Sequence, residues 1–229
     1  MRIFVSALAV GELRVTGDEH HYLGRVRRAR PGDTLELLDG AGKRARASIV
    51  QIGDAETIVR IETIEDVEDL PPRVRVLVPP IKGDRMDTCI EKLVEVGADE
   101  IVVWPAARAV VKLDGARRTS RTAHLEAIAQ AAARQCGRAR APRVVASDSL
   151  ASAIAGLAGA RVVLDPGAER AAFPLAAEVT VVSGPEGGFA ANEREALADF
   201  TAIGLGPRVL RAETAPVIAV ALVRAATQS

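Results

Sequence analysis

The chain from Arg73 onward alternates between short aliphatic runs and amphipathic helical patterns, and this alternation constrains the fold more than any other feature. Strands that alternate with helices form a mostly parallel sheet covered on both faces. The sequence therefore predicts an α/β domain over residues 73–229. Strands are predicted at 73–78, 100–104, 161–164 and 179–183, and helices at 84–96, 117–135, 149–157, 192–199 and 214–227. Asn192 is the expected N-cap of the fourth helix, and Thr214 is a candidate cap for the last.

Residues 1–70 follow a different pattern, with several short strands at close spacing. Strands are predicted at 2–6, 34–38, 44–52 and 57–64, with a short helix at 18–28. Pro31-Gly32-Asp33 and Asp39-Gly40-Ala41-Gly42 are typical of turns between them. The acidic segment 65–72, which ends in two prolines, is a plausible linker. We therefore expect a small β-barrel at 1–70 and the α/β domain at 73–229.

The composition predicts a soluble cytoplasmic protein with an aliphatic core. Hydrophobic residues make up 48% of the 229 residues but aromatic residues only 3%, so Val, Leu, Ile and Ala must fill the core. The two cysteines suggest a reducing compartment; Cys89 is expected in the core, and Cys136 has no His neighbour that would mark it as a nucleophile. No signal peptide, membrane span or metal-ligand pattern is recognised.

Basic residues are concentrated in two segments although the formal net charge is zero. Arg25, Arg27, Arg28 and Arg30 lie within one short segment. The segment from Arg108 to Arg143 contains nine basic residues and two acidic ones. Segregated charge creates a surface field, so a polyanion lying across both domains is one interpretation. The alternatives are solvated helix faces or ion pairs across the fold. Arg outnumbers Lys 26 to 4, which suits phosphate recognition but is equally expected from a GC-rich genome.

Two glycine-bearing loops follow predicted strands and precede helices: 183–189 and 205–215. Open α/β sheets bind ligands at such strand ends. The first loop, Gly184-Pro185-Glu186-Gly187-Gly188, lacks the Lys and Ser/Thr of a phosphate loop and the glycine spacing of a dinucleotide fingerprint. Gly187 and Gly188 allow positive φ and close ligand approach, which suits an adenine or a ribose; the alternative is an ordinary turn before a helix. Leu164-Asp165-Pro166-Gly167 is a third loop after a strand.

These loops resemble the signature segments of the SPOUT superfamily of S-adenosylmethionine-dependent RNA methyltransferases. The closest resemblance is to the RsmE type, which methylates N3 of a uridine in 16S ribosomal RNA. The segments 20–33 with Asp39-Gly40, 82–97 and 134–138 with Pro142 are also similar to that family, so the likeness covers nearly the whole chain. Family members usually carry Thr at the position of Ala212.

The resemblance implies a trefoil knot in the C-terminal domain, a PUA-like N-terminal barrel that binds RNA, and a homodimer acting on 16S rRNA in the small ribosomal subunit. It implies S-adenosylmethionine as the cofactor and no metal. The cofactor-binding residues it implies are Leu164, Ser183, Gly184, Pro185, Glu186, Gly187, Gly188, Leu205, Gly206, Leu210, Arg211, Ala212, Thr214 and Ala215. The expected RNA-binding residues are Arg25, Arg27, Arg28 and Arg30 in the barrel and Arg134 and Arg138 in the catalytic domain.

Arg211 and Glu213 are the expected catalytic residues. Arg211 would stabilise negative charge on the uracil oxygens. Glu213 or Glu186 would accept the N3 proton or orient Arg211, and we favour the orienting role for Glu213; the pair could also be an ordinary surface ion pair. His20 and His21 are expected to cap or pack. Alternative functions are methylation at another rRNA or tRNA position, non-catalytic RNA binding, and a nucleotide-dependent reaction.

Overall fold

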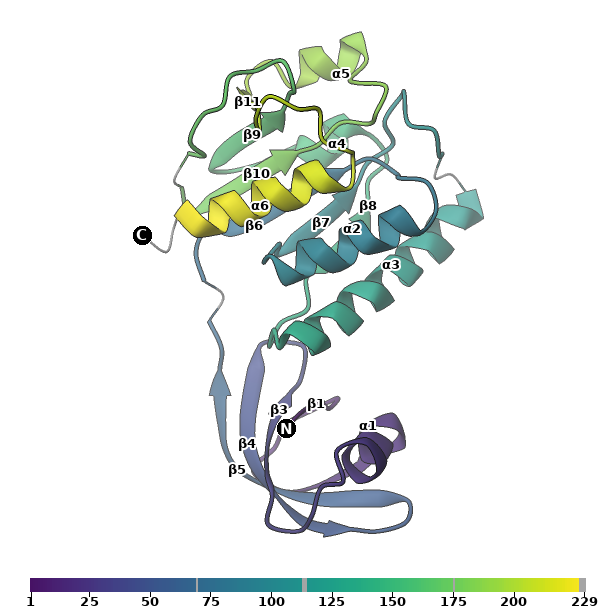
Figure 1. Ribbon diagram of the computed structural model, residues 1–229, viewed down its shortest axis with the longest axis vertical. Coiled ribbons are helices and arrows are strands. Elements are labelled where there is room, and N and C mark those ends of the chain that lie inside the picture. The colour runs from purple at the N-terminus through teal and green to yellow at the C-terminus, as the bar shows by residue number, and fades with distance from the viewer. Residues whose placement is uncertain (69, 113–114, 175, 227–229) are drawn as a thin grey trace. The chain divides into compact units, whose positions relative to one another are not determined.

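The computed structural model describes residues 1–68, 70–112, 115–174 and 176–226 (Figure 1). The chain divides into two compact units: of the described residues, 1–68 and 133–141 form the first, and the others form the second. The segment 133–141 belongs with the first unit because it pairs with the turn around Gly40. The Gly42 N–H donates to the Ala139 carbonyl at 3.1 Å, and the Ala141 N–H to the Gly40 carbonyl at 3.2 Å.

The first unit is built on a five-stranded sheet in the order β1-β3-β4-β5-β2. Alternating side chains of the long antiparallel strands, together with Leu23 of the helical segment, form an aliphatic core. β2 is not predicted because it is an edge strand in which only Val15 is buried. The predicted linker begins too early, since Asp66 still pairs with Lys43 in the sheet. The elements are β1 (Arg2–Phe4), β2 (Gly11–Thr16), α1 (Gly17–His21), the π-helix η1 (Tyr22–Val26), β3 (Thr34–Leu38), β4 (Lys43–Ile52) and β5 (Glu56–Asp66).

The second unit is a six-stranded parallel sheet in the order β11-β9-β10-β6-β7-β8, with helices packed on it (Figure 1). The predicted α/β class with a parallel sheet is therefore confirmed. The two strands that sequence patterns miss, β8 and β11, are short and lie at the sheet edges. The elements are β6 (Arg73–Val78), α2 (Asp84–Glu95), β7 (Glu100–Val103), α3 (Gly115–Cys136), β8 (Arg143–Ala146), α4 (Leu150–Ile154), β9 (Ala160–Leu164), β10 (Glu178–Val182), α5 (Ala191–Ala196), β11 (Thr201–Ile203) and α6 (Thr214–Ala226).

The helices of the second unit pack in pairs. α2 and α6 pack on each other, and α6 contacts β6 and β10. α4 and α5 pack together, and their side chains join a cluster with Leu77, Trp104 and Val182. The described helices include none long and apolar enough to cross a membrane.

Two predicted helix caps differ from the structure. α5 begins at Ala191, so Asn192 lies inside the helix; the Glu193 carboxylate instead accepts the Ala190 N–H at 2.7 Å. A carboxylate at the third helical position can reach back in this way without a polar N-cap residue. Thr214 is the first residue of α6, and its N–H donates to the Arg211 carbonyl at 2.9 Å. The predicted end of this helix, Thr227, lies outside the described residues.

One arginine fixes the far end of α6. The Arg224 guanidinium donates to the carbonyls of Leu70, Pro72 and Gly97 at 2.6–3.0 Å. It also donates to the Asp99 carboxylate at 2.6 Å, and both side chains are largely buried. Charge-assisted hydrogen bonds of this kind are stronger than neutral ones. Anchoring α6 at its C-terminal end orients its N-terminal end, where the second glycine-bearing loop enters the helix.

Candidate functional site

A cavity of about 460 Å³ lies at the carboxyl ends of three neighbouring parallel strands, β9, β10 and β11. Each strand leads directly into one of the three loops that the sequence singles out, after Leu164, Val182 and Ile203. The size is that of a small-molecule site, and strand ends of a parallel sheet are where α/β folds bind ligands. The structure thus brings the three loops together around one cavity.

Most of the predicted cofactor-binding residues line this cavity. Gly187 and Thr214 are not among the lining residues, and neither is Glu213. The predicted residues that do line it are Leu164, Ser183, Gly184, Pro185, Glu186, Gly188, Leu205, Gly206, Leu210, Arg211, Ala212 and Ala215.

Several further lining residues were not among the predicted cofactor-binding residues. Asp165, Pro166 and Phe189 belong to the loops that the sequence indicates, so loop position could have found them. Arg194 comes from α5, whose place beside the cavity only the folded chain reveals. The remaining additional lining residues are Ile203, Arg208 and Val209.

The glycines of the first loop serve different purposes. Gly188 has φ 71°, a conformation that favours glycine, as predicted. The predicted positive φ at Gly187 is wrong, because the φ of this residue is not positive. Glycine is needed there for close packing instead, since a Cβ would lie 3.0 Å from the Arg108 Cβ. A Cβ on Gly184 would lie 2.8 Å from the Phe189 ring. The loop therefore depends on glycine both for a turn and for close packing.

Buried contacts hold this loop against the segment that follows β7. The Phe189 ring stacks on Trp104, with centroids 6.0 Å apart and the planes 8° from parallel. The buried Glu193 carboxylate accepts the Ala107 N–H at 2.7 Å in addition to the Ala190 N–H. A buried carboxylate that accepts backbone N–H groups avoids the cost of unpaired burial. These contacts fix the cavity wall in place.

The two predicted catalytic residues occupy different environments. The Arg211 side chain is 75% exposed and lines the cavity, whereas the Glu213 side chain is 15% exposed. The Arg211 Nη1 and Glu213 Oε1 atoms are 3.9 Å apart, which is an ion-pair distance but too long for a hydrogen bond. Glu213 therefore lies behind Arg211 rather than facing the cavity.

Arg85, in the first turn of α2, is a residue that sequence reasoning missed. Its Nη1 lies 3.6 Å from Glu213 Oε2 and 3.7 Å from Glu186 Oε1. Glu213 Oε2 is buried and has no hydrogen-bond partner among the described residues. Since an unpaired buried carboxylate is costly, the Arg85 charge stabilises Glu213 there. Arg85 thus connects the loop after β10 with the loop before α6.

Cys89, one turn after Arg85, is buried as predicted. Burial, together with the nearby charge of Glu213, raises the pKa of the Cys89 thiol to about 12. The thiol of an unfolded cysteine has a pKa of about 8.5. Because the folded thiol keeps its proton above that pH, this group contributes stability that is lost as pH rises toward 12.

We expect iodoacetamide at about pH 8 to alkylate native Cys136, which is exposed, but not Cys89. Mass spectrometry should find one label per native chain and two after unfolding in urea, since the chain has two cysteines. Rapid native labelling of Cys89 would contradict the described packing of α2.

The predicted RNA-binding arginines all lie in the first unit. The side chains of Arg25, Arg27, Arg28 and Arg30 are exposed and form no ion pair with the described residues. Arg134 and Arg138, which are predicted to belong to the catalytic domain, lie in the segment 133–141 that groups with the first unit. The Arg134 guanidinium lies over the Phe4 ring, and its Nη1 is 3.6 Å from Glu19 Oε1. The Arg138 side chain is half-buried.

His20 packs as expected. Its Nδ1 lies 2.9 Å from Thr57 Oγ1, and its Nε2 lies 3.2 Å from the Asp54 carbonyl. Both ring nitrogens are thus engaged within the first unit. His21 is exposed, and its side chain forms no hydrogen bond or ion pair with the described residues.

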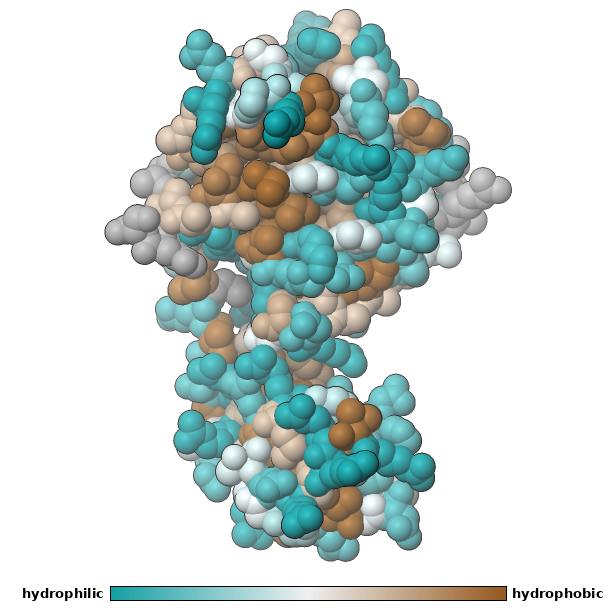
Figure 2. All heavy atoms as spheres, viewed as in Figure 1, coloured by the Kyte–Doolittle hydropathy of each residue, from teal (hydrophilic) through white to brown (hydrophobic). Residues whose placement is uncertain are grey.

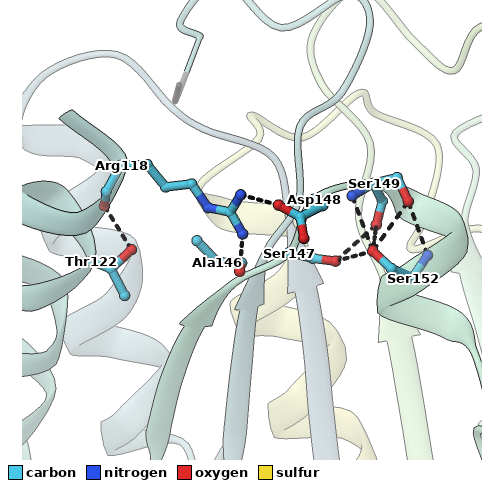
Figure 3. Close-up of polar contacts among 7 residues, drawn as sticks. All are labelled: Arg118, Thr122, Ala146, Ser147, Asp148, Ser149 and Ser152. Atoms are coloured by element: carbon cyan, nitrogen blue, oxygen red, sulfur yellow. Dashed lines mark hydrogen bonds and ion pairs between the residues drawn. The ribbon is translucent and has the colours of Figure 1, made fainter. Parts of the chain in front are cut away.

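A second polar cluster at the sheet edge has a structural explanation (Figure 3). Ser149 is the N-cap of α4, and its Oγ accepts the Ser152 N–H at 3.0 Å. Arg118 binds the Asp148 carboxylate and the Ala146 carbonyl, so it ties α3 to the end of β8. The described residues include no cluster of His, Cys, Asp and Glu suited to a metal ion.

Comparison with known proteins finds similarity over almost the whole chain. The RNA methyltransferase domain family matches residues 68–224, and the RNA methyltransferase PUA domain family matches residues 15–62. A protein of Mycobacterium bovis named ribosomal RNA small subunit methyltransferase E is 36% identical over 91% of this chain and 84% of its own length. A Bacillus subtilis protein of the same name is 30% identical over 93% of this chain and 90% of its own.

A solved structure shares the fold. The structure of a ribosomal RNA small subunit methyltransferase E from Neisseria gonorrhoeae, bound to S-adenosyl methionine, is 28% identical in sequence. It aligns with a TM-score of 0.81 and covers 98% of this chain and 97% of its own. Both units of this chain therefore have counterparts in that protein.

Proposed function

Because the chain belongs to the RNA methyltransferase family, whose domain matches residues 68–224, we propose that it transfers a methyl group from S-adenosylmethionine to N3 of a uridine in 16S rRNA. The observation that carries this proposal is the cavity formed by the three loops after β9, β10 and β11. The family places the chemistry in this domain, and the cavity is where its strand-end loops converge.

The cavity residues fit the proposed cofactor. Gly184, Gly188 and Gly206 let a nucleoside approach the main chain, and Leu164, Leu205 and Leu210 provide apolar walls. Ala212 in place of the family's usual Thr removes a hydroxyl but leaves the backbone contacts. The cofactor supplies an electrophilic methyl group when bound. The loops bind it and exclude water from the side that faces the sheet.

Arg211 is the proposed catalytic residue. Uracil N3 carries a proton at neutral pH and becomes nucleophilic only when that proton leaves. A guanidinium near the uracil oxygens stabilises the charge that then develops. Arg211 is well placed for this, since it lines the cavity and is exposed to an incoming base. Of the two nearby acids, Glu186 lines the cavity and is the better candidate to receive the N3 proton.

Glu213 takes the orienting role in this proposal. Its two oxygens lie between Arg85, 3.6 Å from Oε2, and Arg211, 3.9 Å from Oε1. The Arg85 charge stabilises the buried Glu213 carboxylate, and this carboxylate in turn restrains Arg211. Both Arg85 and Glu213 are therefore positioning residues.

Replacing Arg85 with Gln should lower kcat about tenfold while the Kd for S-adenosylmethionine changes less than about threefold. Arg85→Lys should retain most of the activity, because it keeps the charge near both carboxylates. Lys92→Gln is the control, since it removes a positive charge from the same helix at a side chain whose ion-pair partners among the described residues are Glu91 and Glu95. A double mutant with Glu213→Gln should lose less than the product of the two single effects. Strictly multiplicative losses would contradict the coupling.

We further propose that the protein is a homodimer. α6 exposes Ile218 and Leu222, and Figure 2 displays apolar side chains over this helix. Exposed apolar patches of this kind are typical of protein interfaces. Sedimentation equilibrium of the purified protein tests this, and Leu222→Asp should shift a dimer toward monomer.

The finer features of fold and location also remain proposals. We propose that the loops around 183–189 and 205–215 belong to a trefoil knot, which the convergence of both loops before α6 supports. We propose that Arg25, Arg27, Arg28 and Arg30 of the first unit, together with Arg134 and Arg138, contact rRNA. The first four form no ion pair with any residue that the structure describes, which supports this, as does the PUA domain match over 15–62. A cytoplasmic location follows from the proposed ribosomal substrate.

The decisive experiment uses small ribosomal subunits, naked 16S rRNA and bulk tRNA from a strain that lacks the gene. Each is incubated with the protein and labelled S-adenosylmethionine, and the modified nucleoside is mapped by mass spectrometry. The proposal predicts 3-methyluridine at a single position. A 2′-O-methylated ribose, or label only in tRNA, would reject the assigned reaction.

A further inference from the structure

The charged side chains that line the cavity differ in whether they form ion pairs or hydrogen bonds with the protein. Three arginines and two acids line it: Arg194, Arg208, Arg211, Asp165 and Glu186. Both acids are engaged, because Asp165 Oδ1 accepts the Gly167 N–H at 2.8 Å and Glu186 lies 3.7 Å from Arg85. Unpaired positive charge therefore remains at the cavity.

Arg208 is the least restrained of the three arginines. It is exposed and has no carboxylate partner among the described residues. Arg194 also lacks a carboxylate partner there, but its Nε donates to the Phe189 carbonyl at 3.2 Å, which restrains it. Arg211 already faces Glu213. Of the three, Arg208 has the guanidinium most available to a ligand.

Val209, the next residue, is 81% exposed although it lines the same cavity. It stands between two arginines, Arg208 and Arg211, in the loop that precedes α6. An apolar side chain in water next to a free guanidinium is complementary to a ligand with an apolar face and an anionic group. An unstacked nucleotide has both, since its base can pack on apolar atoms and its phosphate can bind a guanidinium bidentately.

We infer that Arg208 and Val209 form the docking site for the target nucleotide, with Arg208 on an adjacent phosphodiester and Val209 against the base. The inference rests on the proposed function and names two substrate contacts within it. The cofactor's sulfonium is positive, as is the arginine-rich rim, so an anionic strand is the favoured occupant. A second copy of the chain covering Val209 is the alternative that the test must exclude.

The test compares Arg208→Gln and Val209→Ser with Arg161→Gln. Arg161 lies at the amino end of β9, opposite the cavity, in a surface pair with Asp199 at 2.6 Å, so its loss should cost little. For Arg208→Gln we expect KM for the RNA substrate to rise about tenfold and the salt slope of RNA binding to fall by about one. Val209→Ser should raise KM about threefold with an unchanged salt slope, since it removes no charge. The Kd for S-adenosylmethionine should stay constant in all three.

Each outcome decides the inference. If Arg208→Gln behaves like Arg161→Gln, Arg208 does not bind the substrate. If Val209→Ser changes the sedimentation coefficient instead of KM, Val209 belongs to a protein interface and the inference is wrong. Wild-type protein is assayed in parallel, so a failure of methyl transfer itself would reject the proposed function separately from this docking site.

Discussion

Arg211→Ala should reduce kcat for methyl transfer by about a hundredfold, with the Kd for S-adenosylmethionine changed less than about threefold. The side chain is 75% exposed at the cavity, so the cofactor loop does not depend on it for packing. In the proposed mechanism its loss removes the positive charge that stabilises the uracil anion, an interaction that is strongest in the transition state. Single-turnover methyl transfer and isothermal titration of the cofactor measure the two effects separately.

Arg161→Ala is the matched control for the Arg211 prediction. Arg161→Ala removes an arginine from the opposite end of β9 and should leave both quantities nearly unchanged. Arg211→Lys should recover part of the rate, because the charge returns without the planar guanidinium. Equal losses of cofactor binding and of rate would assign Arg211 to cofactor binding instead.

Gly184→Ala should weaken S-adenosylmethionine binding at least about tenfold, equivalent to about 1.4 kcal/mol. The new Cβ would lie 2.8 Å from Cζ and 2.9 Å from Cε2 of the Phe189 ring. Stacking on the fully buried Trp104 restrains that ring. The loop must move instead, and overpacking of this kind costs about 1–3 kcal/mol.

Gly24→Ala is the control for the Gly184 prediction, since a Cβ at Gly24 would have no neighbour within 4 Å and its φ is not positive. It should keep wild-type cofactor affinity and nearly the same Tm. Calorimetry and thermal melts of both variants are sufficient. Normal cofactor affinity in Gly184→Ala would mean that this loop does not form the binding surface.

The α/β architecture was predictable because its central strands are mostly aliphatic and longer than those at the edges. β6 and β10 lie in the middle of the parallel sheet, where both faces are buried and sequence patterns are strong. β8 and β11, at the edges, are only four and three residues long. Short edge strands carry little of the periodicity on which such predictions depend.

The candidate site was predictable in its backbone but only partly in its side chains. Glycine-bearing loops after strands identified the three cavity segments, because strand direction alone brings those loops together. Arg85 could not be identified in this way, since it lies more than a hundred residues from Glu186 and reaches it only through the packing of α2 against α6. The same holds for Arg194 and for the buried Glu193, whose partner Ala107 lies 86 residues away.

The last turn of α3 groups with a different compact unit from the rest of the helix. Its pattern is continuous, so the sequence places Arg134 and Arg138 with the α/β domain. The last turn instead packs with the first unit, where Arg134 lies over Phe4. Arg134 and Arg138 therefore belong to the same unit as Arg25, Arg27, Arg28 and Arg30. If these six arginines bind rRNA as proposed, mutations in either group should affect the same binding step.

The central claim is that the loops after β9, β10 and β11 hold S-adenosylmethionine mainly through their main-chain atoms. A crystal structure of the protein with the cofactor tests it most directly. We predict density for the nucleoside in the cavity, within hydrogen-bond distance of backbone atoms of the 183–188 and 205–210 loops, and with the methyl group facing Arg211. A cavity left empty at saturating cofactor, or cofactor bound elsewhere in the chain, would contradict that claim.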